Sequence, residues 1–141
     1  MYPLVQPSRR SSCLSDAGAA SSLFTSLFAS DDAEALEFTG SAEFERLAAL
    51  GTSCPDHFLR TKIAPLTLDP AKLQDDAYLE QKIADYRDLY AAYYERCKRA
   101  NSPAMRDSNP VVVLMPNVKR ITFATDKTTA RLAGEFYGNA I

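Results

Sequence analysis

The stretch VVVLMPNVKRITFA, residues 111–124, decides the fold class. Its first five residues form an unbroken apolar run of strand length, which is typical of a strand buried on both faces. Residues 116–119 turn the chain, and residues 120–124 predict a second short strand. Thr125 or Asp126 then caps a closing helix, and a strand pair followed by a helix predicts a mixed α/β layered domain. The residues of that helix expected to face inward are Ala130, Ala133, Phe136, Tyr137 and Ala140.

The chain upstream of this stretch is predicted to be mainly helical. A stripe of side chains at alternating four- and three-residue steps predicts a long helix over residues 75–99; its members are Leu79, Ile83, Tyr86, Tyr90, Tyr93 and Cys97. The tyrosines of this helix could stack bases or sugars, but we favour the alternative that their rings complete the core. Shorter expected elements are helices over 31–38 and 41–50, the second closed by Gly51, a strand at 66–68 and a capped turn at Asp69-Pro70.

Residues 1–30 differ from the rest because serine is abundant and charge is sparse. We interpret them as a disordered or weakly helical tail, in which the Leu-Phe pairs within residues 23–28 could form one short apolar face. An arginine pair among the serines also faintly resembles a transit peptide. The folded part is therefore expected to be residues 31–141.

The composition of the 141 residues excludes several function classes. Lys plus Arg total 16 and Asp plus Glu total 18, so the net charge of −2 lacks the basic footprint of a nucleic-acid binder. No apolar run approaches the roughly 20 residues that a membrane helix needs. The three cysteines are an odd and sparse set, which favours a reducing compartment and predicts a cytoplasmic location. Neither nucleic acid nor a membrane is an expected partner.

One short cluster carries the residues best suited to bind a ligand. It consists of Asp56, His57, Arg60 and Lys62, an acid, an imidazole and two cations within seven residues. A helical turn would bring His57 and Arg60 to one side, and a guanidinium grips a phosphate or a carboxylate by two parallel hydrogen bonds. The alternative is that the two cations are solvated and that His57 only packs or caps.

The sequence shows no complete catalytic or metal-binding set. Cys54 and His57 have C-x-x-H spacing, but zinc needs three or four ligands and His57 is the only histidine. The same pair could be a nucleophile and its base. No glycine-rich dinucleotide or phosphate loop and no G-x-S-x-G motif occurs. We therefore assign no catalytic residue and no metal ligand, and we expect no cofactor in this chain.

Several separated motifs resemble those of one family. GTSCPDHFLRTKIAPL (51–66), the tyrosine-rich helix, MRDSNPVVVLMP (105–116) and ITFATDKTTARLAGEFYGNAI (121–141) follow one another in order. This order resembles the bifunctional rhamnulose-1-phosphate aldolase/short-chain alcohol dehydrogenase family, in the region between the class II aldolase core and the dehydrogenase part. The resemblance covers roughly residues 31–141. It implies an incomplete three-layer class II aldolase-like α/β segment with a disordered N-terminal tail.

The departures from the family pattern bear on activity. Class II aldolases carry a zinc-binding histidine in a related strand-turn-strand segment, and Val118 stands at that position here. Zinc and NAD belong to the full-length family, whereas this chain lacks both catalytic sets. The resemblance thus implies a fragment or truncated form that is not catalytic alone, and the alternative is a non-catalytic module that binds a sugar phosphate or a protein. The expected partners are a sugar phosphate, the remaining aldolase/dehydrogenase domains, or a second copy of the chain through self-association.

Overall fold

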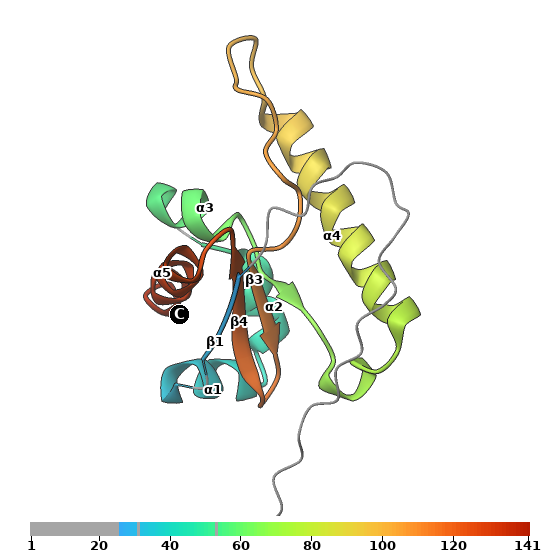
Figure 1. Ribbon diagram of the computed structural model, residues 1–141, viewed down its shortest axis with the longest axis vertical. Coiled ribbons are helices and arrows are strands. Elements are labelled where there is room, and N and C mark those ends of the chain that lie inside the picture. Colours follow the sequence, from blue (N-terminus) through green and yellow to red (C-terminus); the bar gives the residue numbers. More distant parts are fainter. Residues whose placement is uncertain (1–25, 31, 53) are drawn as a thin grey trace, which may run out of the picture.

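The computed structural model describes residues 26–30, 32–52 and 54–141, and this part of the chain forms one sheet flanked by helices (Figure 1). The strands are β1 (Ser26–Ser30), β2 (Leu66–Thr67), β3 (Val112–Met115) and β4 (Lys119–Ala124), in the spatial order β1-β4-β3-β2. The helices are α1 (Ala33–Gly40), α2 (Phe44–Leu50), α3 (Pro55–Thr61), α4 (Asp76–Cys97) and α5 (Lys127–Gly138), with a short 3₁₀ helix at Pro70–Lys72. No helix among these described residues is long and apolar enough to span a membrane. The mixed α/β prediction is confirmed.

The hairpin of β3 and β4 is the centre of the sheet. The two strands pair antiparallel, with Val113 opposite Ile121. In the turn, Asn117 has φ +55°, a left-handed conformation that asparagine tolerates better than most residues, and the Val118 amide donates to the Met115 carbonyl at 3.1 Å. Every residue of β3 is buried, as the unbroken apolar run predicts. This short β-branched segment therefore forms the hydrophobic middle of the domain.

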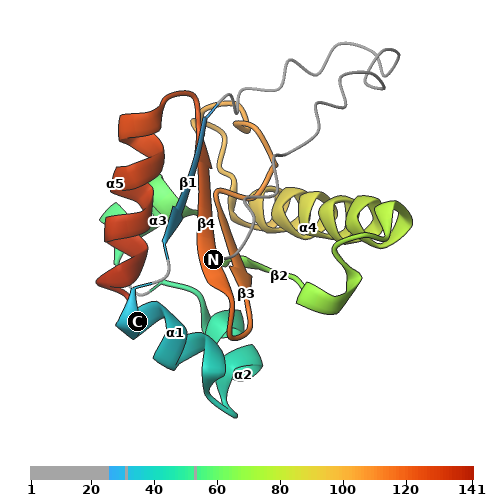
Figure 2. The same cartoon turned by 60° about the horizontal axis from the view of Figure 1, so that its bottom comes forward.

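The alternation of β3 and β4 gives the sheet two different apolar faces. Val112 and Leu114 point to the face covered by α2 and α5, where they pack with Tyr137. Val113 points to the other face, where it packs with Tyr86 of α4. Figure 2 shows α5 and α4 on opposite sides of the strands. Helix, sheet and helix thus form three layers, but α4 lies beside the β2 edge and leaves part of its face open.

The N-terminal strand β1 was not foreseen from the sequence. Ser26–Ser30 pairs antiparallel with β4, with Phe28 opposite Thr122. Phe28 points toward α5, where a Cβ built on Gly134 would lie 3.5 Å from its ring. The prediction of a disordered or weakly helical segment is therefore wrong for residues 26–30, because pairing with a distant strand decides their conformation. The rest of the expected tail, including Leu23 and Phe24, lies outside the described residues.

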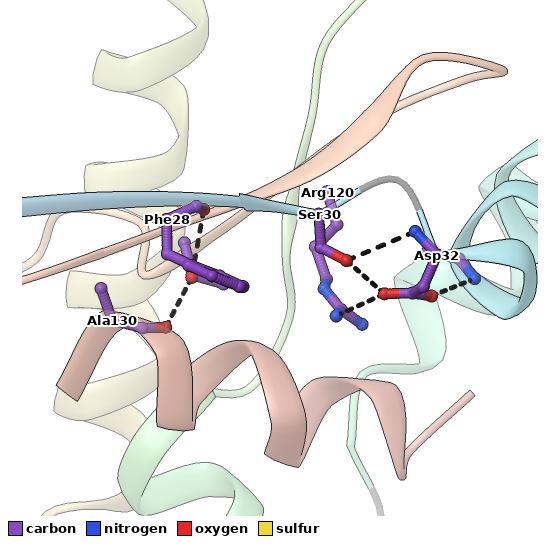
Figure 3. A network of polar contacts seen from close by, with 7 residues as sticks. Phe28, Ser30, Asp32, Arg120 and Ala130 are labelled. Carbon is purple, nitrogen blue, oxygen red and sulfur yellow. Dashed lines mark hydrogen bonds and ion pairs between the residues drawn. The ribbon is translucent and has the colours of Figure 1, made fainter. Parts of the chain in front are cut away.

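A polar network holds β1 and α1 against β4 (Figure 3). The buried Arg120 guanidinium donates to the Asp32 carboxylate at 3.0 Å, and that carboxylate also caps α1 by accepting from the Ala35 amide at 2.8 Å. The Ser30 hydroxyl donates to the same carboxylate. This hydroxyl and the Ala35 amide lower the pKa of Asp32, and Arg120 lowers it further. The short link from β1 to α1 is thus fixed by one carboxylate with three donors.

Most of the other predicted elements are confirmed, with shifted ends. Asp75 caps α4 and Asp126 caps α5, each by accepting a backbone amide of the first turn. On α4, Tyr86 is buried, whereas Cys97 is exposed, so the expected stripe does not reach the end of that helix. On α5, Ala130, Ala133, Gly134 and Tyr137 are buried and Phe136 is half-buried. Ala140 lies beyond the helix and is exposed, contrary to prediction.

Candidate functional site

Helix α3 carries the predicted cluster, but its side chains do not converge on one point. Pro55 starts the helix with a fixed φ that suits the first turn, and Cys54 precedes it in an extended conformation. The His57 ring meets the Phe136 ring of α5 edge-on, with centroids 5.7 Å apart. The Arg60 guanidinium lies 4.6 Å from the centroid of the same Phe136 ring. Asp56 is exposed and forms no ion pair with any described residue.

Lys62 follows the last residue of α3, and its buried ammonium contacts the loop after α4. Its backbone has φ +62° and ψ −173°, a conformation that residues other than glycine rarely adopt. Its ammonium donates to the Asp107 carbonyl at 2.5 Å and to the Asn109 carbonyl. It also lies 4.3 Å from the centroid of the Tyr90 ring. Lys62 therefore ties the end of α3 to the loop that follows α4.

Burial changes the acid–base behaviour of this lysine. Only 11% of its side chain is exposed, and burial lowers the pKa of Lys62 from 10.5 to about 8 because an ammonium is poorly solvated there. The Asp107 carboxylate, 4.0 Å away, opposes this effect. The ammonium form is still the main one at neutral pH. Its donors are directed at backbone oxygens, so Lys62 is less available to a ligand than its sequence neighbours suggested.

A cavity of about 490 Å³ lies beside α3, at the end of the sheet where β3 begins and β4 ends. Arg60 and Lys62 line it, whereas Asp56 and His57 do not. The loop after α4 adds Arg106 and Asp107. Phe58, Leu59, Tyr90, Val111, Phe123, Ala124, Thr125, Thr129 and Ala133 complete the lining. The cavity thus combines an apolar wall with three cations and one acid.

Sequence reasoning missed Arg106 and Asp107 because their segment was predicted only as a loop. The sole local signal was a charged pair, Arg106-Asp107, within a segment rich in Asn, Ser and Pro. Their position at the cavity depends on the anchoring of the loop by Lys62 and on a hydrogen bond of 2.6 Å from Arg87 to the Asn109 side chain. No local pattern encodes these contacts.

The tyrosines of α4 are used for packing and for holding the loop. The Tyr86 hydroxyl donates to the Ala64 carbonyl at 2.9 Å, and burial raises the pKa of Tyr86 strongly. The Tyr94 hydroxyl donates to the Pro103 carbonyl at 2.7 Å. Tyr90 lies under Lys62, and its ring centroid is 6.2 Å from that of Tyr93. The core alternative is confirmed for Tyr86 and for Tyr90, which packs against the same cluster, whereas Tyr94 holds the loop.

Cys54 and His57 do not fit a zinc site or a nucleophile–base pair. Among the described residues, no group of three or more His, Cys, Asp or Glu side chains could hold a metal ion. Nδ1 of His57 is buried and has no hydrogen-bond partner among those residues, and no described hydrogen bond joins its ring to the Cys54 thiol. Cys97 is exposed on α4, and Cys13 lies outside the described residues. The side chains present therefore give no support for zinc chemistry.

A dinucleotide cofactor does not fit the strand-to-helix turn that the structure contains. The turn between β4 and α5 has no glycine, and Asp126 caps the helix by accepting from the Thr129 amide at 2.9 Å. The Thr129 hydroxyl and amide lower the pKa of Asp126, so its negative charge occupies the place that a pyrophosphate would need. The described residues thus offer no NAD site at this turn.

A second, apolar groove of about 640 Å³ lies on the α4 face of the sheet. Ile121 and Phe123 of β4, Val113 and Met115 of β3, and Leu79 and Ile83 of α4 are among its lining residues. Leu27 of β1 pairs opposite Phe123 and is 53% exposed, so the apolar surface continues across the sheet edge. This groove is the part of the three-layer fold that α4 leaves open.

Comparison with known proteins establishes the family of this α/β domain. Residues 7–141 match the family described as "Aldolase class II, second domain", and the chain belongs to that family. The sequence resemblance was expected to begin near residue 31, and the family match begins well upstream of that residue. Among curated proteins, the chain is similar to "Uncharacterized oxidoreductase YuxG" of Bacillus subtilis (strain 168), with 26% identity over 116 residues. That alignment covers 79% of this chain but only 17% of the relative, and no solved structure matches.

Proposed function

We propose that this chain is part of a sugar-phosphate aldolase/short-chain dehydrogenase of the rhamnulose-1-phosphate type, and that it supports the aldolase without carrying its catalytic groups. The observation that carries the proposal is the match of residues 7–141 to a family described as the second domain of a class II aldolase. The order of the sequence motifs and the oxidoreductase name of the similar Bacillus protein support it. In this proposal, zinc and NAD are held by other parts of a cytoplasmic protein.

The apolar groove on the α4 face is the surface that this role requires. A second domain implies a first, and the chain spans only 17% of the relative that it matches. We therefore propose the first aldolase domain as the occupant of the groove. Burial of apolar surface favours such a contact. Ile121, half-buried at the centre of β4, is the side chain best placed to contribute.

The activity of the purified 141-residue chain tests the non-catalytic role. The chain is incubated with zinc and rhamnulose 1-phosphate, and cleavage is measured with and without a chelator. We expect no chelator-sensitive cleavage, because a class II aldolase uses its metal to stabilise the enediolate and Val118 cannot ligate a metal. Zinc-dependent cleavage that the chelator abolishes would contradict the proposal.

The exposure of the groove is tested by binding of a fluorescent dye that reports apolar surface. Ile121→Thr keeps a β-branched residue on β4 but removes apolar surface from the groove, and we expect it to lower the dye signal. Leu50→Thr is the matched control, since Leu50 is 71% exposed on α2 and lies outside the groove. An equal loss of signal in both variants would show that the groove is not the main apolar surface.

A non-catalytic module that binds a sugar phosphate is the second candidate function. The cavity beside α3 favours it, because its volume of about 490 Å³ is within the range of small-molecule sites and Arg60 and Lys62 line it. Calorimetric titration of the chain with a ketose 1-phosphate tests this candidate function. Saturable binding supports it, and the absence of binding at neutral pH contradicts it.

A further inference from the structure

The cavity beside α3 has an excess of positive charge that its own acid does not balance. Arg60 and Lys62 come from the end of α3, and Arg106 and Asp107 come from the loop after α4. Lys62 and Asp107 lie 4.0 Å apart and offset each other. The two guanidiniums therefore remain as a net charge of about +2 facing the cavity.

The two arginines differ from the lysine in having no acidic partner. Within residues 26–30, 32–52 and 54–141, neither Arg60 nor Arg106 forms an ion pair or a side-chain hydrogen bond. Arg60 is held by its contact with the Phe136 ring, which leaves its N–H donors available. Lys62, in contrast, directs its donors at the Asp107 and Asn109 carbonyls and so fixes the loop that carries Arg106.

The remaining wall of the cavity is apolar and partly open. Leu59 is 75% exposed and Phe58 is 39% exposed, although both line the cavity. Val111 and Ala133 add aliphatic surface deeper in the wall. A ligand that fits this site therefore has an anionic end for the arginines and a compact body that covers carbon surface.

We propose that the cavity binds a phosphate monoester with a small apolar or sugar body, and that Arg60 and Arg106 clamp its phosphate from two elements. A phosphate monoester carries about −1.5 to −2 charges at pH 7, which matches the two unpaired guanidiniums better than a single carboxylate does. Guanidiniums also bind phosphate oxygens by paired, directed hydrogen bonds. The site differs from the predicted cluster, because Arg106 joins it and Asp56 and His57 do not.

This inference rests on the second candidate function for the presence of a phosphate ligand, and it adds the two arginines that hold the phosphate. Calorimetric titration of the whole chain with phenyl phosphate, inorganic phosphate, phenol and a ketose 1-phosphate separates these points. We expect phenyl phosphate to bind more tightly than inorganic phosphate or phenol, because only it satisfies both halves of the cavity. Its affinity should fall as salt is added, since the arginines are exposed to screening ions.

Variants of the two arginines locate the site. Arg60→Gln and Arg106→Gln should each weaken phenyl phosphate binding about tenfold or more, since each removes a charged donor pair. Arg131→Gln is the matched control and should change the affinity less than about twofold, because Arg131 pairs with Glu135 on the outer side of α5. Circular dichroism verifies that each variant is folded.

The outcomes separate the inference from the candidate function. Phenyl phosphate binding that both arginine variants leave unchanged would overturn the proposed clamp, and so would the absence of saturable binding to the folded wild-type chain. Binding of phenyl phosphate but not of the ketose 1-phosphate would support the clamp and overturn the sugar-phosphate module. Binding of both ligands, weakened by both variants, would support both.

Discussion

Replacement of Lys62 by methionine tests how the cavity beside α3 is built. Methionine is an unbranched apolar side chain of similar length, but it removes the ammonium that lies over Tyr90 and leaves the Asp107 and Asn109 carbonyls without that donor. An unpaired buried acceptor costs about 1–3 kcal/mol, and part of this cost is offset because no ammonium has to be buried. We expect Lys62→Met to lower the free energy of unfolding by about 2 kcal/mol at pH 7.

The pH dependence of this loss is the sharper test. The pKa of Lys62 is about 8 in the folded chain and about 10.5 when the chain unfolds. Between these values the unfolded chain binds more protons, so the stability of the wild type rises with pH, whereas that of Lys62→Met gains nothing from this position. Each pH unit is worth at most about 1.4 kcal/mol, and solvent at the end of the side chain reduces this value. The loss should therefore be about 1 kcal/mol larger near pH 9.5 than near pH 7.

Urea denaturation followed by circular dichroism measures both quantities. Lys127→Met serves as the control, because Lys127 is exposed at the start of α5, and it should change stability by less than about 0.5 kcal/mol at either pH. A loss for Lys62→Met that stays constant or shrinks as the pH rises would refute the reasoning about a buried charge. The absence of any loss near pH 7 would refute the role of the two carbonyl contacts.

Three further predictions concern stability and association. Gly51→Ala should cost more than about 4 kcal/mol and prevent folding in circular dichroism, since φ is +70° and a Cβ would lie 1.8 Å from the Ile63 carbonyl oxygen. Gly134→Ala should instead raise stability by about 0.5–1 kcal/mol, because Gly134 lies within α5 and its Cβ would make ordinary 3.5 Å contacts with Phe28 and Thr122; a lower thermal midpoint would contradict this. The isolated chain should self-associate through the groove around Ile121, and light scattering that shows only monomer at high concentration would count against it.

The elements that the sequence predicted correctly are those whose signal is local. The run at residues 111–115 is too apolar and β-branched for any place but the middle of the sheet, and β3 is buried throughout. A turn joins β3 to β4, and Asn117 tolerates the left-handed conformation that this turn contains. Asp126 caps α5 by accepting a backbone amide of the first turn of that helix. The periodicity of α4 likewise needs only neighbouring residues. Sequence alone therefore established the α/β class, the hairpin and the main helices.

The N-terminal strand and the cavity depend on contacts between distant residues. The apolar pattern of residues 26–30 is too short to distinguish a helix from a strand. These residues form a strand because they pair with β4, with Phe28 opposite Thr122. Arg106 shares a cavity with Arg60 because the Lys62 ammonium is buried against carbonyls 45 and 47 residues away. The entropy of closing such long loops is offset only when the whole domain packs. The sequence thus determined which segments could be helices and strands, while tertiary packing decided which charges share a cavity.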